Sequence, residues 1–408
     1  MSLLSSNPEH VSLTIGGAPY EVVGLDGEER ISSLFRFDIV CSIQGIPPAV
    51  AGLIGQDAEI ILRDGHGNER NVTGLIASAE VRVSDADSSE LHVEVRPYPF
   101  ALTVGRDCRA FQNSTVVDIV RQVVAPVRGT KRFELGRAYH QRAYTVQYRE
   151  DDWIFATRML EDEGIYYWFD HAGGSALVFG DDSTAAPDAP GGAIISFAYE
   201  SGMTTSKEVI VELATSTRAA PTQFTVASFD FNRPLLKVQG SAGGGPYEHY
   251  DAPGGGPDDP AICAARARTR LEAANAAREG YEGSSTSVRL FPGVVFQLVD
   301  HPMARLEARY LVVGTRYKVE QRRRNGNAER AYECTFHAIR AQVPYRAPEE
   351  LPRPRQLGAQ SGIVVGPPGE EIHPESAGPR ARAAALGSPG QPQRHLGHVD
   401  ARLAAWIG

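Results

Sequence analysis

Residues 144–169 constrain the fold most, because they contain a strand, a helix and a second strand, each with its own boundary signal. Apolar and polar residues alternate from Tyr144 to Tyr148, which is the period of a half-buried strand. Asp151 and Asp152 follow, where acceptors for the free N–H groups of a helix are favoured. Gly164 can adopt the left-handed conformation that ends a helix, and an aromatic strand follows at residues 165–169. The apolar helix residues recur at helical spacing: Trp153, Ala156 and Leu160, and also Phe155 and Met159.

Length and composition limit the class of protein. A chain of 408 residues predicts about two to four domains. A net charge of −9 gives no electrostatic reason to bind nucleic acid or an anionic membrane, and the apolar runs are too short to span a bilayer. The N-terminal residues show no Sec-type signal, so we expect cytoplasmic synthesis with reduced thiols. The cysteines are scattered without metal-ligand or redox spacing: Cys41, Cys108, Cys263 and Cys334.

The chain divides into five segments of different character. Residues 1–105 contain short strands separated by Gly, Asn and Asp turns, which indicates a β-barrel or sandwich. Residues 106–182 form an α/β module, and residues 183–345 return to strands with one helix. Residues 346–373 are expected to be an extended connector, and residues 374–408 a tail without regular structure. The fold class is therefore mainly β, with two strand-rich regions separated by a small α/β module.

Several boundaries follow from local signals. Thr115 and Asp118 form a capping-box-like helix start. A second helix is expected at residues 261–277, with Asp259 as its cap and Gly280 as its end. Residues 240–256 are too glycine-rich to predict a strand, and residues 321–330 are expected to be the polar turn of a hairpin.

The motifs along the chain resemble those of the VgrG spike proteins of type VI secretion systems, which are related to phage tail hubs. The resemblance in the opening block is carried by Arg142, Tyr144, Gln147, Tyr148, Glu150, Phe155, Arg158, Leu160, Glu161, Glu163, Gly164 and Ile165. It continues through Arg109, Phe111 and Gln112, through the segment Leu290, Pro292, Gly293, Phe296 and Leu298, and through His301, Pro302 and Tyr310. Ala252 departs from the family pattern, since a second aromatic residue is usual there. The resemblance extends to about residue 373.

The resemblance implies a structural role. It implies a homotrimer in which two similar barrels per chain make a pseudo-six-fold ring that caps the hexameric Hcp tube. Baseplate proteins and an effector or adaptor are the other implied partners, and export through the secretion machine is implied without a Sec signal. Alternatives are the hub of a phage tail or of an extracellular injection particle, and a nonfunctional truncated remnant. An enzyme carried on a hub is disfavoured, because no additional domain of adequate length is present.

The resemblance implies that residues 362–372 open the OB-type neck that relatives carry below a β-helical needle. The family pattern then stops at Gly378, before the rest of the neck and the needle. Residues 379–388 are rich in Ala, Pro, Gly and Arg. Suppose that the present gene carries one extra C directly after the codon for Gly378. Without that base, permitted codons for residues 379–382 read Arg-Val-Arg-Val in the restored frame. Residues 383–388 then read Gln-Leu-His-Trp-Asp-Arg, which is similar to the family continuation. We therefore expect residues 379–408 to be an out-of-frame tail, and the alternative is a naturally short hub with an unrelated tail. Sequencing of the gene distinguishes the two.

No catalytic, cofactor or metal site is predicted, although several clusters invite one. Residues 150–152 and 161–163 are acidic, and we expect a helix N-terminus and a solvated helix face, respectively. Glu248, His249 and Asp251 lack ligand periodicity and are expected in an exposed loop. His301 precedes a proline and is expected to be structural.

Three further patterns have plain structural interpretations. The glycines of residues 243–245 and 254–256 lack the context of a phosphate site. Residues 322–324 are three arginines and are expected at a solvated hairpin tip, with an acidic partner as the alternative. The aromatic residues of the opening block are expected in the core: Trp153, Tyr166, Tyr167, Trp168 and Phe169.

Overall fold

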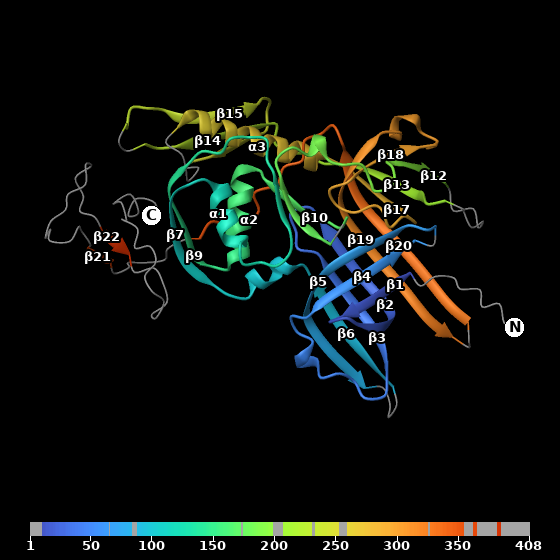
Figure 1. Ribbon diagram of the computed structural model, residues 1–408. Coiled ribbons are helices and arrows are strands. Elements are labelled where there is room, and N and C mark those ends of the chain that lie inside the picture. Colours follow the sequence, from blue (N-terminus) through green and yellow to red (C-terminus); the bar gives the residue numbers. More distant parts are fainter. Residues whose placement is uncertain are drawn as a thin grey trace.

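Two closed β-barrels joined side by side form the larger part of the molecule (Figure 1). The computed structural model describes residues 10–64, 66–83, 88–172, 174–198, 207–230, 233–252, 259–324, 327–354, 362–364 and 382–384. The predicted fold class, mainly β with barrels and a smaller α/β part, is confirmed.

The first barrel closes because β1 pairs with both β4 and β2. Its strands follow the ring order β1-β4-β5-β6-β3-β2. Alternate residues of β3, Phe37, Ile39 and Cys41, are fully buried inside it. The strands are β1 (Val11–Ile15), β2 (Ala18–Arg30), β3 (Arg36–Gln44), β4 (Asp57–Arg63), β5 (Glu69–Val83) and β6 (Ser88–Arg96).

The second barrel closes through the pairing of β19 with β20, in the ring order β19-β18-β12-β13-β17-β20. Its own core contains Phe296, Tyr310 and Phe336. The strands are β12 (Ile194–Phe197), β13 (Val209–Thr217), β17 (Glu279–Ser285), β18 (Val295–Val299), β19 (Arg309–Arg324) and β20 (Asn327–Arg340).

The β2–β19 ladder joins the two barrels into one continuous sheet. In this ladder Gly27 lies opposite Tyr317. A Cβ at Gly27 would overlap the ring of Phe37, which stacks on Tyr317 with ring centroids 6.3 Å apart. The glycine therefore leaves the space in which an aromatic pair crosses the joint.

The α/β module lies beside the barrels, with α1 and α2 next to β7 and β9 (Figure 1). The predicted caps are confirmed: Thr115 and Asp118 form a reciprocal capping box, Asp151 Oδ1 accepts from Ile154 N, and Gly164 has a φ of 65°. The elements are β7 (Asp107–Ser114), α1 (Val116–Val124), β8 (Lys131–Glu134), β9 (Arg142–Glu150), α2 (Asp152–Glu163), β10 (Tyr166–Asp170) and β11 (Ala176–Gly180).

The aromatic strand β10 is buried on both faces, which explains its unbroken apolar run. Tyr167 and Phe169 belong to the core shared by the first barrel and the module. Tyr166 and Trp168 point the other way, into a cluster with residues of the second barrel such as Leu311. The prediction that the aromatic residues of this block are core residues is confirmed.

The strand predicted at residues 144–148 is confirmed as part of β9, with an unexpected buried face. Thr145 and Gln147 are the buried residues, whereas Tyr144, Val146 and Tyr148 are half-buried. Gln147 is fully buried because its amide is used: it accepts from Arg109 Nε at 2.9 Å and donates to Asp152 Oδ1 at 2.8 Å.

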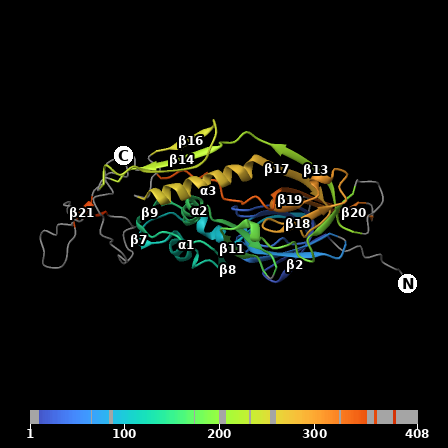
Figure 2. The same cartoon turned by 90° about the horizontal axis from the view of Figure 1, so that it is seen from above.

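A third layer covers the module from one side, as Figure 2 shows. It consists of a sheet in the order β15-β14-β16, with α3 packed on it. The elements are β14 (Gln223–Ser228), β15 (Val238–Gly243), β16 (Glu248–Asp251) and α3 (Pro260–Arg278).

The expectation that residues 240–256 contain no strand is wrong. β15 extends into this range and β16 lies within it. Gly240 has a packing role in β15, since it lets this strand approach α3 closely. A Cβ at Gly240 would overlap the backbone of Ala264. Asp259 caps α3 as predicted, but Gly280 does not end the helix, since the chain turns extended at Glu279 and enters β17.

Two other expectations need correction. The polar turn at residues 321–330 is much shorter than expected, because β19 and β20 remain paired as far as Arg324 and Asn327.

Most of residues 374–408 lie outside the described residues, but β22 (Arg382–Ala384) pairs with β21 (Gly362–Val364). The expectation of no regular structure is wrong for those three tail residues. Strand pairing uses backbone N–H and C=O groups, which all residues except proline have in full, so it does not depend on side-chain composition. The domain boundaries at residues 105, 182 and 345 remain our proposal.

The close contact at Gly240 gives a prediction. Gly240→Ala is expected to lower the free energy of unfolding by about 1–3 kcal/mol, because the added methyl group forces α3 away from β15. Gly244→Ala is the matched control, since nothing lies within 4 Å of its Cβ position. Denaturant titration compares the two variants, and equal stabilities would contradict the packing account.

Candidate functional site: a buried charged junction

The acidic residues at the start of α2 have structural partners, as expected. Glu150 accepts from Arg158 Nε and Nη2, both at 2.8 Å. Asp151 is the helix cap, and Asp152 Oδ1 accepts from Arg109 Nη2 at 2.6 Å. These carboxylates are paired with cations or backbone N–H groups, which is the arrangement that a helix N-terminus requires.

The expectation of a solvated face at residues 161–163 is wrong. The Asp162 side chain is only 6% exposed and lies 3.1 Å from Arg142, 3.7 Å from Arg266 and 3.0 Å from Arg353. Glu161 Oε2 accepts from the backbone N–H groups of Glu350 and Leu351, both at 3.0 Å. The face is half-buried, because residues of α3 and of the connector contact it.

The residues considered as metal ligands or nucleophile partners do not converge. His249 stacks on Phe224, Asp251 pairs with Arg270 at 2.7 Å, and Glu248 accepts from Thr225 Oγ1. All three residues lie in the strand β16, so the prediction that they belong to a loop is wrong. Among the described residues, no group of three or more His, Cys, Asp or Glu side chains is placed to hold a metal.

His301 has a local structural role. Its Nδ1 accepts from the backbone N–H of Met303 at 3.0 Å, and the centroids of its ring and that of Phe197 lie 4.4 Å apart. The glycines at residues 254–256 lie outside the described residues, as do the side chains of Arg322, Arg323 and Arg324.

The structure reveals a charged junction that joins both barrels and the module. Glu29, at the end of β2, accepts from Arg70 Nη2 of β5 at 2.6 Å. Its second oxygen lies 2.7 Å from His171 Nε2, just after β10. Arg70 also donates to the hydroxyl of Tyr317 on β19 at 3.0 Å, and Tyr317 donates to the carbonyl of Leu290 at 2.6 Å. The Glu29–Arg70 pair therefore connects the first barrel to the module through His171 and to the second barrel through Tyr317.

The junction includes a Ser–His–Glu arrangement similar to that of hydrolases. Ser175 Oγ lies 2.8 Å from His171 Nδ1, and Ser175 has a φ of 51°. Its Oγ, however, accepts from the backbone N–H of Thr73 at 2.8 Å, and the side chains of Ser175, His171 and Glu29 are buried. The bond to Thr73 holds the hairpin after β10 to β5, and the burial of the three side chains keeps Ser175 Oγ away from solvent.

Electrostatics favour the ionised carboxylates of both buried networks. Burial alone would raise the pKa of Glu29, but the charges of Arg70 and His171 and their hydrogen bonds outweigh it, and the pKa falls from 4.5 to about 2. Burial likewise opposes ionisation of Asp162, yet Arg266, Arg353 and Arg142 hold its pKa well below its usual range. Glu161, next to Asp162, is the exception, since burial raises its pKa.

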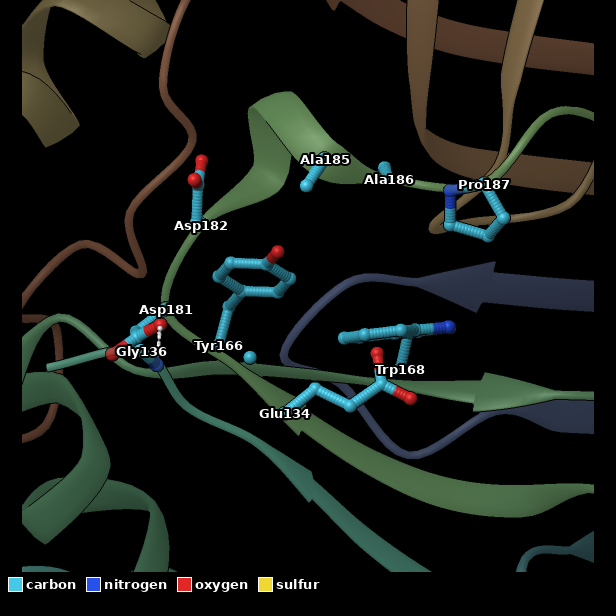
Figure 3. A pocket seen from close by; sticks show the side chains of 10 residues that line it. Glu134, Gly136, Tyr166, Trp168, Asp181, Asp182, Ala185, Ala186 and Pro187 are labelled. Atoms are coloured by element: carbon cyan, nitrogen blue, oxygen red, sulfur yellow. Dashed lines mark hydrogen bonds between the residues drawn. The ribbon is translucent and has the colours of Figure 1, made fainter.

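A small cavity of about 150 Å³ lies between the module and the start of the second barrel (Figure 3). The rings of Tyr166 and Trp168 stack 5.5 Å apart along it, and Glu134 and Asp182 flank them. The carboxylate of Asp181 already has hydrogen-bond partners, since it accepts from Gly136 N at 2.9 Å and from Tyr139 OH at 2.8 Å. Ligand pockets usually measure roughly 300–1,000 Å³, so this cavity does not indicate a substrate site.

The junction gives a prediction on pH dependence. The folded-state pKa of Glu29 is depressed, so its contribution is complete above pH 4.5 and is lost as the pH falls towards 2. Glu29→Gln should flatten this part of the stability profile. At pH 7 the substitution should also lower the free energy of unfolding by about 3–5 kcal/mol, because Arg70 stays buried without its counter-charge.

The measurement is denaturant unfolding from pH 7 to pH 2. Glu282→Gln is the control, since the side chain of Glu282 is 66% exposed on β17. An unchanged profile for Glu29→Gln would show that the junction does not stabilise the fold.

Comparison with known proteins assigns the family. The model of the phage tail baseplate hub (GPD) family matches residues 28–323. The type VI secretion system spike protein VgrG1c of Pseudomonas aeruginosa is 30% identical over 386 residues, covering 90% of this chain and 52% of that protein. VgrG1a of the same organism is 29% identical, covering 87% of this chain and 57% of that protein. The chain thus spans about half the length of these curated relatives.

Solved structures agree with the fold. The E. coli c3393 protein, described as a type VI secretion component with structural similarity to the T4 tail proteins gp27 and gp5, gives a TM-score of 0.70 at 23% identity. The match covers 91% of this chain and 88% of that chain. Because the hub family model covers most of the chain, from β2 to β19, the protein belongs to the phage tail baseplate hub family and resembles the VgrG spike proteins within it.

Proposed function

We propose that this protein is the hub of a type VI secretion machine, in which three copies form a ring that caps the hexameric Hcp tube. The observation that carries the proposal is the presence of two closed six-stranded barrels in each chain. Three chains would present six barrels, so a three-fold assembly could meet a six-fold tube with one barrel for each tube subunit.

The joint between the barrels supports this role. A ring that adapts one symmetry to another needs barrels held at a fixed spacing, because a flexible joint would let them drift from the tube subunits. Here the β2–β19 ladder and the Glu29 junction hold the two barrels together at the backbone and at buried side chains. The proposed mechanism is symmetry adaptation and transmission of force.

The partners follow from the proposed assembly. They are further copies of this chain, the Hcp tube, baseplate proteins, and an effector or adaptor. We also propose that the protein leaves the cell through the machine itself. Among the described residues, no helix is long and apolar enough to cross a membrane.

We propose no enzymatic role for the chain. The partnered carboxylates and the closed Ser–His–Glu relay support this proposal. One relative, from Vibrio cholerae, is named actin cross-linking toxin VgrG1; it is 27% identical, and the match covers 34% of its length.

The test is the mass of the protein in solution, alone and with Hcp, by light scattering coupled to size exclusion. We expect a complex containing three copies of this chain for each Hcp hexamer. A phage tail-tube protein in place of Hcp serves as the specificity control. A monomer that never joins either tube would contradict the hub function, and binding to the phage tube alone would favour the phage alternative.

A further inference from the structure

The segment that follows β20 leaves the second barrel and runs across the rest of the molecule. The backbone N–H of Tyr345 donates to Ser183 Oγ at 2.6 Å, and Ala347 is only 4% exposed. Residues 345–354 then pass between α2 and α3, where side chains of both helices contact them. The chain is therefore anchored a second time, away from the barrel it has just left.

The α2 side of this anchor uses consecutive acidic residues. Glu161 Oε2 accepts from two successive backbone N–H groups, those of Glu350 and Leu351. Asp162 Oδ1 lies 3.0 Å from Arg353 Nη2. Two adjacent side chains of one helix thus hold both the backbone and a side chain of the crossing segment.

The α3 side uses pairs of opposite polarity. Glu272 of α3 accepts from Arg346 Nε at 2.7 Å, and Arg270 of α3 pairs with Glu349. Arg346 also donates to the backbone carbonyl of Asp181, at the end of β11. A positive and a negative residue of the segment therefore bind α3, so a shift along the helix would misalign both pairs.

The centre of the anchor is shielded from water. Asp162 and Arg266 side chains are each 6% exposed, and that of Arg142 is 13% exposed. Water and salt compete weakly with ion pairs at such positions. Breaking the contact of Arg353 would leave the remaining charges to reorganise in a confined space.

We propose that this clamp between α2 and α3 is the point at which tension on the C-terminal part of the chain enters the hub. Force applied beyond residue 354 would reach the α/β module and the α3 layer first, and the β19–β20 hairpin only after the clamp has opened. The source of the tension rests on the proposed function, whereas the clamp itself does not.

The test is single-molecule pulling of the full chain, with one handle at the exposed Gln122 of α1 and the other at the C-terminus. In the wild type we expect a first step as residues 345–354 leave the clamp, which lengthens the chain by up to ~35 Å. Glu161→Ala and Arg353→Gln should each lower the force of this step, and the double variant should lower it further. The paired control is Glu80→Gln with Arg82→Gln, an exposed ion pair on β5.

Hydrogen exchange gives an independent readout of the same clamp. In Glu161→Ala the amides of Glu350 and Leu351 should exchange roughly fivefold faster, as expected for one lost hydrogen bond of about 1 kcal/mol. The amides within α1 should be unchanged, which shows that the module remains folded.

Equal first-step forces in the wild type and the double variant would overturn the clamp, as would unchanged exchange at Glu350 and Leu351. Tube binding separates this result from the proposed function. If the chain binds Hcp but shows no clamp step, only the clamp is contradicted. If the chain shows the clamp step but never trimerises, only the hub function is contradicted.

Discussion

The antiparallel ladder between β2 and β19 is the constraint on which the rest of the structure depends. It converts two closed barrels into one sheet, so that neither can rotate against the other without breaking backbone hydrogen bonds. The Glu29 carboxylate adds β5 and the segment after β10 to the same joint. The module is thereby fixed to the barrels at the point where they meet.

Two networks of buried charge join parts of the chain that are distant in sequence. Arg70 reaches Glu29 and Tyr317 across two barrels, and Asp162 gathers Arg142, Arg266 and Arg353 from β9, α3 and the connector. Apolar packing alone tolerates sliding, whereas charge pairs with defined hydrogen bonds set a register. For a protein proposed to transmit force, this difference matters more than the net contribution of each pair to stability.

Local signals predicted much of the fold but little of its joints. The caps at Thr115, Asp151 and Asp259 and the end at Gly164 lie where the sequence placed them, because each depends on neighbouring residues only. Gly240 was misleading, since the closeness of α3 that makes glycine necessary there is a tertiary contact. The strand β2 carries Glu29, although its glycines and charges hide the alternation that is typical of a strand. Nothing local distinguishes that glutamate from its exposed neighbour Glu28, and only the assembled barrels bring Arg70 and His171 to it.

The central claim is that the two barrels of each chain act as equivalent positions of a six-fold ring. Electron cryo-microscopy of the protein bound to Hcp tests it most directly. The account predicts six barrels around the tube axis, alternating between the β1–β6 barrel and the β12–β20 barrel, with one facing each tube subunit. A complex in which only one barrel type contacts the tube, or in which the barrels lie at unequal distances from its axis, would contradict it.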